Sequence, residues 1–120
     1  GGGVRVPEPL MATTYTFTPV NLTCYAQQDG QNDVVYNIDW RYQASDGKYG
    51  YLTEGATTTT YIPGTPFVPY DQLTEAEVVN WIEESLGPIT LAQMQQQADA
   101  AIAAQYASPI TNPSLPWEQP

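Results

Sequence analysis

The stretch VVYNIDWRYQASDG, residues 34–47, decides the fold. In a β-strand, successive side chains point to opposite faces of the sheet. Along residues 34–43, a mainly apolar set of side chains alternates with a mainly polar set. The first set is Val34, Tyr36, Ile38, Trp40 and Tyr42, and the second is Val35, Asn37, Asp39, Arg41 and Gln43. This alternation predicts a strand with one face in the core and the other in water.

Two Asp-Gly pairs, Asp29-Gly30 and Asp46-Gly47, flank this strand. Asp-Gly between alternating segments is a strong signal for a tight hairpin turn. Residues 12–64 are also rich in Tyr, Val and Thr, which are common in strands. We therefore expect an antiparallel β-meander of three strands, or of four if the last one is interrupted near Glu54-Gly55.

The first expected strand contains Pro19, which has no backbone N–H to donate to a sheet. The apolar positions change register at this proline. They are Tyr15 and Phe17 before it, and Val20, Leu22 and Cys24 after it. The change of register predicts a bulge or a kink at Pro19.

Helical signals begin after a proline-rich linker at residues 65–73. Thr74, with Glu77 three residues later, forms the capping-box pattern of a helix start. Gly87-Pro88 is a typical helix stop, and a second helix is expected to begin at Thr90. The sequence thus predicts a pair of antiparallel helices in residues 74–106.

We expect one α+β domain at residues 12–107, since 120 residues suffice for one core of ordinary size. Its predicted architecture is a three- to four-stranded antiparallel β-meander packed on two C-terminal α-helices, with extended Pro-rich tails. Residues 1–11 are expected to be a flexible N-terminal extension or a tag. Residues 108–120 are expected to form an extended Pro-rich C-terminal tail.

The composition argues against several classes of partner. Thirteen Asp and Glu against three Lys and Arg give a net charge of −10. Such a surface repels phosphate backbones and anionic lipid headgroups, so we expect neither nucleic acid nor a membrane as a partner. No apolar run approaches the roughly 20 residues of a membrane-spanning helix.

The residues that usually carry catalysis are scarce. The chain has no histidine, and Cys24 is its only cysteine. This excludes a Ser-His-Asp triad, a Cys-His pair, a two-His metal site and an internal disulfide. We therefore predict a protein that is not an enzyme, with no catalytic, metal-binding or cofactor-binding residues and no cofactor.

Two polar groups have both a functional and a structural interpretation. Asp29, Asn32 and Asp33 supply oxygen atoms as a calcium loop does, but they lack its spaced carboxylates and closing Glu, so an ordinary turn is favoured. Arg41, near Asp39, is expected to face Glu54 across the sheet. A cross-strand ion pair is favoured there over acid–base catalysis.

Tyrosine is unusually frequent, with nine residues against two phenylalanines. Surfaces that recognise proteins or sugars use tyrosine heavily, because it combines a large contact area with a polar tip. Tyr49, Tyr51 and Tyr61 are therefore candidates for a glycan-binding face. The alternative is a small sheet whose core positions are half exposed.

The chain also resembles a known family. The segments VVYNIDWRYQASDGKYG and PFVPYDQLTEAEVVNWIEESLG, a Gln- and Ala-rich helix, and NPSLPW near the end are similar to small proteins of unknown function from tailed bacteriophages, notably marine and cyanobacterial phages. The resemblance covers roughly residues 13–118. That family has no assigned active site, so no functional residues carry over. The resemblance implies a phage product of virion or virion-associated type.

The last tryptophan lies in SLPWEQP, residues 114–120, and Pro109 and Pro113 upstream together with Pro116 keep the tail extended. Leu115, Pro116 and Trp117 are therefore candidates for partner binding, since Trp is enriched among binding hot spots. Alternatively, Trp117 clasps the tail onto its own domain. We expect a non-enzymatic virion protein, located in the virion or in the host cytoplasm before assembly, that docks onto other virion subunits and self-associates. The alternative is a small module that binds a host glycan or a host protein.

Overall fold

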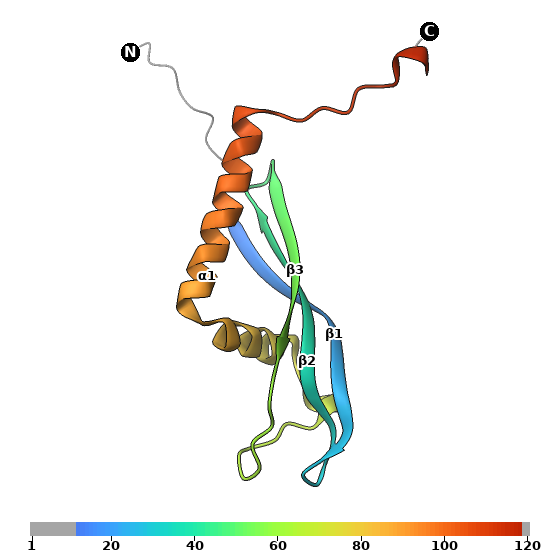
Figure 1. Cartoon of the computed structure of the whole chain (residues 1–120), viewed down its shortest axis with the longest axis vertical. Coiled ribbons are helices and arrows are strands. Elements are labelled where there is room, and N and C mark those ends of the chain that lie inside the picture. The colour runs from blue at the N-terminus through green and yellow to red at the C-terminus, as the bar shows by residue number, and fades with distance from the viewer. Residues whose placement is uncertain (1–11, 119–120) are drawn as a thin grey trace.

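Three strands form one antiparallel sheet in the computed structural model, which describes residues 12–118 (Figure 1). The strands are β1 (Thr14–Gln28), β2 (Gln31–Ser45) and β3 (Gly50–Thr58), and their order is β1-β2-β3. One long helical element, α1 (Glu75–Ala107), follows them. The α+β class and the three-stranded antiparallel sheet are therefore confirmed. The extension expected at residues 1–11, and residues 119–120 of the expected tail, lie outside the described part.

Both Asp-Gly pairs make the turns that the sequence predicts. Asp29 has φ 51° and Gly30 has φ 82°, the backbone conformation that a two-residue hairpin turn requires at both positions. Gly47 has φ 92° in the turn between β2 and β3. That turn is closed by the Asp46 N–H, which donates to the Tyr49 carbonyl at 3.1 Å.

The pairing of β1 with β2 is interrupted twice. The first irregularity lies between Pro19 and Asn21, as predicted, and it leaves Val20 52% exposed. Val20 is the extra residue of a bulge, so its predicted place among the core residues was wrong.

The second irregularity was not predicted. Thr23 pairs with Asn37 but Cys24 pairs with Val35, so Tyr36 is the extra residue on β2. A shift of one residue moves side chains to the opposite face of a sheet. Val35, predicted on the polar face, therefore belongs to the core cluster, whereas Val34 is buried outside that cluster. Tyr36 stacks on Tyr25 instead, with 4.3 Å between ring centroids.

The core lies between the sheet and α1. Its centre on the sheet is aromatic: Phe17 meets Trp40 edge-on at 5.2 Å and Tyr42 at 4.8 Å between ring centroids. The buried members of the cluster are Phe17, Val35, Ile38, Trp40, Tyr42, Ala44, Val78, Ile82, Ala98 and Ile102. Four of these come from α1, so the helix supplies the second layer of the domain.

β3 is continuous through Gly55, where the sequence predicted a break. Gly55 lies opposite Trp40, and the indole N–H of Trp40 donates to the Thr57 hydroxyl at 3.0 Å. A Cβ atom at position 55 would lie 2.5 Å from Cζ2 of Trp40. The glycine therefore makes room for the indole over the strand, and its presence does not mark the end of the strand.

α1 begins as expected and then differs from the prediction. Thr74 caps the helix by accepting the Glu77 N–H at 3.2 Å. Gly87 leaves helical geometry, with φ 80° and ψ 163°, and Pro88 then starts the next helical turn, where its missing N–H has no cost. The chain re-enters the helix at once, so there is no loop in which it could reverse. The stop predicted at Gly87-Pro88 is therefore present as a break between two helical segments of α1, but the segments meet at a bend, and the antiparallel arrangement we expected for them was wrong (Figure 1).

The two parts of α1 cover different regions of the sheet (Figure 1). Val78 and Ile82 are the buried residues of the part before the bend, and Ala98 and Ile102 are those of the part after it. Between β3 and α1, the chain forms one 3-10 turn at Tyr70–Gln72. After α1, residues 109–115 have no regular secondary structure, and Pro116–Glu118 forms a second 3-10 turn.

The Gly55→Ala substitution is expected to lower the melting temperature by about 5–15 °C, because overpacking a core contact typically costs ~1–3 kcal/mol. Thermal unfolding followed by circular dichroism measures this. Gly50→Ala is the milder substitution for comparison in the same strand, since its Cβ would lie 3.2 Å from one atom, the Ala44 carbonyl oxygen, which would have to shift by only a few tenths of an ångström. Equal melting temperatures for the two variants would contradict the packing assigned to Trp40.

Candidate docking site

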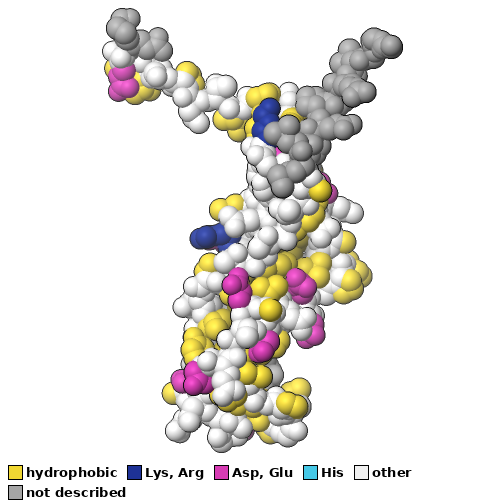
Figure 2. All heavy atoms as spheres, turned by 180° about the vertical axis from the view of Figure 1, so that it is seen from behind, with side chains coloured by type: hydrophobic (Ala, Val, Ile, Leu, Met, Phe, Trp, Pro, Cys, Tyr) yellow, Lys and Arg dark blue, Asp and Glu magenta, His cyan; other side chains and the backbone are white. Residues whose placement is uncertain are grey.

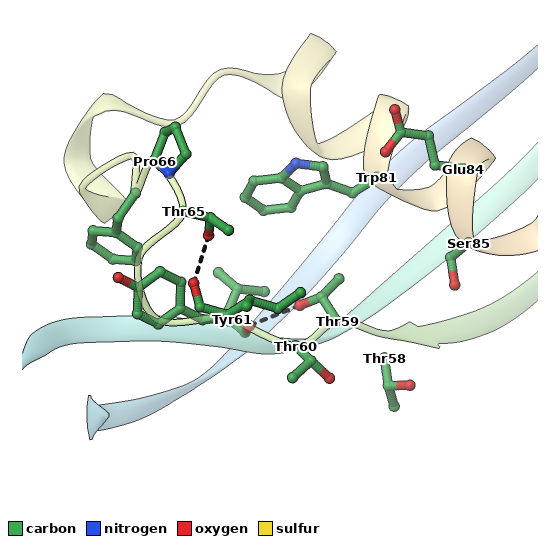
Figure 3. A pocket seen from close by; sticks show the side chains of 12 residues that line it. Thr58, Thr59, Thr60, Tyr61, Thr65, Pro66, Trp81, Glu84 and Ser85 are labelled. Carbon is green, nitrogen blue, oxygen red and sulfur yellow. Dashed lines mark hydrogen bonds between the residues drawn. The ribbon is translucent and has the colours of Figure 1, made fainter. Parts of the chain in front are cut away.

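A pocket of about 450 Å³ lies between the segment that follows β3 and the part of α1 before the bend (Figure 3). Its aromatic side chains come from both elements. Trp81 of α1 forms one wall, and Tyr61 and Phe67 of the loop contribute the others. The rings of Tyr61 and Phe67 pack edge to face, with centroids 5.2 Å apart. The pocket therefore presents aromatic surface from two elements far apart in sequence.

Several polar groups at this pocket already have partners within the chain. The Thr59 hydroxyl donates to the Val35 carbonyl at 2.7 Å, and the Thr65 hydroxyl donates to the Ile62 carbonyl at 2.6 Å. The Glu84 carboxylate accepts from the Asn80 amide at 3.0 Å and, in Figure 3, is directed away from the wall formed by residues 58–61. Tyr61, Phe67 and Trp81 are the large apolar side chains of the pocket, and Thr58, Thr60 and Ser85 also line it. An apolar or proline-containing ligand suits such a surface.

The C-terminal tail leaves the body of the protein (Figure 1). It carries exposed apolar side chains. Trp117 is 78% exposed and Ile110 is 79% exposed, and Leu115 is also exposed. The three tail residues selected from the sequence, Leu115, Pro116 and Trp117, therefore lie together and accessible. The clasp interpretation requires a buried Trp117, and in this structure the indole faces solvent.

The start of the tail is positioned by a buried carboxylate. Asp46, fully buried in the turn between β2 and β3, accepts the backbone N–H groups of Lys48 at 2.9 Å and Tyr49 at 2.8 Å. It also accepts the hydroxyl of Tyr106 at 2.6 Å. Tyr106 stands in the last turn of α1, two residues before the C-cap residue Ser108. The hairpin turn thus holds the end of the helix from which the tail departs.

Three more contacts hold the same part of α1. The Tyr15 hydroxyl of β1 donates to the Asp99 carboxylate, and the Gln105 amide donates to the Gly50 carbonyl of β3 at 2.9 Å. The Lys48 ammonium lies over the ring of Tyr106, 5.5 Å from its centroid. Because these contacts involve both edge strands and the turn, the helix end is fixed across the full width of the sheet.

Sequence reasoning missed this set of contacts. Asp46 was interpreted only as a turn residue, because Asp before Gly is common in hairpins. Its partner Tyr106 is 60 residues away, and Tyr15 and Asp99 are 84 residues apart. No local pattern connects residues at such separations, so a single sequence carried no signal for the pairing.

The contacts shift the acidity of the groups that form them. The hydrogen bond from Tyr106 is the main cause that lowers the pKa of Asp46, and the backbone N–H of Tyr49 adds to it. The same bond to Asp46 raises the pKa of Tyr106 to about 12. Similarly, the hydrogen bond to Asp99 raises the pKa of Tyr15 to about 12. Both bonds therefore favour the neutral form of the tyrosine, and the bond from Tyr106 also favours the ionised form of Asp46.

The three tyrosines proposed for a glycan-binding face do not form one surface. Tyr49 packs edge-on against Tyr106 at 4.7 Å, and Tyr51 packs against the core near the start of β3. Tyr61 lies beyond the end of β3, in the aromatic pocket. The structure thus places two of them beside the helix end and the third in the pocket.

The other polar candidates have structural roles. Arg41 pairs with Glu54 across β2 and β3, with 3.6 Å between Nε and Oε1, so the predicted cross-strand ion pair is confirmed. Asp39 accepts the side-chain amides of Asn21 and Asn37. Within residues 12–118, no group of three or more His, Cys, Asp or Glu side chains is placed to hold a metal ion.

Acidic side chains are scattered singly over the face shown in Figure 2, with apolar patches between them. None of the helices in the described part of the chain combines the length and the apolar character needed to cross a membrane.

Comparison with known proteins gives one match. The family model described as Domain of unknown function (DUF7936) matches residues 12–117. No curated protein and no solved structure matches the chain.

Tyr106→Phe is expected to make stability less sensitive to alkaline pH. The pKa of Tyr106 is 10.0 in the unfolded chain and about 12 in the folded chain. Its hydrogen bond therefore stabilises the fold fully below pH 10, and this stabilisation is lost as the pH rises through about 12. The melting temperature of the native chain should therefore fall between these two pH values more steeply than that of the variant. Tyr70→Phe, which removes an exposed phenol, is the control. Parallel curves for Tyr106→Phe and the native chain would show that the bond to Asp46 has no such effect.

Proposed function

The chain belongs to DUF7936, a domain family of unknown function, and we propose that it is a non-enzymatic docking protein. In this proposal it is a virion-associated protein of a tailed phage. It attaches to a larger assembly through Leu115, Pro116 and Trp117, and it also associates with itself.

The exposed indole of Trp117 is the observation that carries the proposal. Removing a large apolar side chain from water stabilises a protein or a complex by roughly 1.5–3 kcal/mol. Trp117 lacks this stabilisation in the isolated chain because it is 78% exposed. Tryptophan is also among the residues most enriched at the centres of protein interfaces. A partner that covers the indole would supply the missing burial.

The composition of the tail supports a role in docking. Pro109, Pro113 and Pro116 restrict the backbone, so an extended tail loses less conformational entropy on binding than a flexible one. Glu118 is the only charged residue in residues 108–118. The segment therefore offers a partner mainly apolar contacts.

The assignment to a virion rests on sequence similarity. Its support is the resemblance of residues 13–118 to small tailed-phage proteins, above all in the helix start at Leu73-Thr74-Glu75 and in Leu115-Pro116-Trp117. The net charge of −10 supports other virion subunits, rather than nucleic acid or a membrane, as the partners.

A second candidate function is the binding of a host glycan or a host protein. The faces of Trp81 and Tyr61 in the pocket favour it, because sugar rings stack on aromatic side chains. The hydroxyls of Thr59 and Thr65 donate their protons to backbone carbonyls, however, and so can only accept hydrogen bonds from a sugar. The pocket thus offers less support for a glycan than the tail offers for a protein partner.

Trp117→Ala is expected to leave the melting temperature nearly unchanged, since exposed substitutions usually alter stability by less than about 0.5 kcal/mol. It should nevertheless reduce incorporation into virions severely, because the docking contact is lost. Quantitative mass spectrometry of purified particles from the phage that carries this gene measures the incorporation.

Ile110→Ala is the matched control, because Ile110 lies on the same tail and is equally exposed. It should be incorporated normally. Absence of the native chain from the particles, or normal incorporation of Trp117→Ala, would refute the proposed docking role.

A further inference from the structure

We propose that the tail of one copy inserts Leu115-Pro116-Trp117 into the aromatic pocket of a second copy, so that copies join head to tail. The inference rests on the proposed function, since it uses the same tail as the docking element, and it names the partner. The pocket is the one bordered by Tyr61, Phe67 and Trp81.

The chemistry of the tail matches that of the pocket. Proline-rich segments favour an extended polyproline II conformation, and aromatic-lined grooves recognise that conformation at little entropic cost. The tail adds Leu115 and Trp117 as apolar side chains to bury. With about 450 Å³, the pocket falls in the range of sites that bind small apolar groups, roughly 300–1,000 Å³.

The distances along the chain favour a second copy over the chain's own pocket. Trp81 and Ser85 line the pocket and precede the bend at Gly87, whereas the tail starts after Ala107. The helix between Gly87 and Ala107 spans about 30 Å at 1.5 Å per residue. The tail from Ser108 to Trp117 also spans about 30 Å when fully extended.

To reach its own pocket, the tail would have to reverse direction at Ser108 and run fully extended along the helix. It runs away from the helix instead (Figure 1). The pocket of a neighbouring copy requires no such reversal. An intermolecular contact therefore fits the observed direction of the tail.

The contact joins two different surfaces, so it is heterologous. Each copy keeps one free tail and one free pocket after a single contact forms, and further copies add to these ends. Contacts of this kind produce rings when the rotation closes and open filaments when it does not. The native chain should therefore form species larger than dimers as its concentration rises.

The negative charge of each copy predicts how salt affects the association between copies. Each copy carries a net charge of −10, and Glu118 of the tail and Glu84 beside the pocket have the same sign. Repulsion between copies weakens as salt shortens the screening length, which is about 10 Å at 0.1 M and about 3 Å at 1 M. Head-to-tail association should therefore become stronger with added salt, unlike docking that depends on attraction between opposite charges.

Complementary variants test the inference. Trp117→Ala removes the inserted side chain, and Ser85→Tyr fills the pocket from an exposed helix position. In sedimentation velocity, each variant alone should self-associate at least tenfold more weakly than the native chain. An equimolar mixture should form a complex of two chains and stop there, because one intact tail meets one intact pocket. Ser85→Ala, the matched control, should assemble like the native chain.

Trp81→Ala is a second pocket variant, with circular dichroism to establish that it is folded. It should behave like Ser85→Tyr in the mixture. The inference is wrong if the native chain stays monomeric at high concentration and high salt, if Trp117→Ala assembles like the native chain, or if the mixture forms no two-chain complex. A crosslink between the tail and the pocket within one monomer would also overturn it.

The experiments distinguish a failure of this inference from a failure of the docking proposal. A native chain that stays monomeric, together with a Trp117→Ala variant that is lost from virions, would reject the head-to-tail contact and leave docking intact. Head-to-tail assembly in solution by a chain that is absent from virions would support this inference and reject the virion role.

Discussion

The carboxylate of Asp46 accepts three hydrogen bonds, and through it the turn between β2 and β3 holds the last turn of α1. The part of α1 after the bend buries Ala98 and Ile102, and Leu91, Met94 and Tyr106 pack against the same core while partly exposed. Polar contacts add to this apolar packing at the end of the helix. A buried carboxylate without partners would be costly, so loss of the hydrogen bond from Tyr106 is expected to loosen the last turns of α1.

The position of the helix end decides what the molecule presents to its surroundings. Because α1 bends at Gly87 and is held at its far end, the pocket beside Trp81 and the tail beyond Ser108 lie at opposite ends of its second part. Head-to-tail assembly requires two different surfaces on each copy, and in our proposal the tail and the pocket are these two surfaces. The buried hydrogen bond between Tyr106 and Asp46 thus positions the helix end that carries the tail we propose for docking.

The sheet was largely predictable from the sequence because its signals are local. The alternation in residues 34–43 and the two Asp-Gly turns predicted the meander, and Pro19 predicted one bulge. The bulge at Tyr36 had no such marker, and it reversed the faces predicted for Val35. The sequence suggested a strand break at Gly55. It could not show that the glycine makes room for an indole, because Trp40 lies on another strand. The tail residues of the candidate site were identified from their composition, whereas the pocket and the contacts of Asp46 join distant segments and left no local pattern.

The central claim is that Asp46 holds the end of α1, and native-state hydrogen exchange of Asp46→Asn tests it most directly. The substitution keeps the shape of the side chain and removes the charge that Tyr106 binds. The account predicts that the amides of residues 98–107 exchange at least tenfold faster than in the native chain, because local opening precedes global unfolding there. Residues 75–86 and the amides paired between β1 and β2 should keep their protection. Unchanged exchange in residues 98–107, or equal acceleration throughout the protein, would contradict the claim.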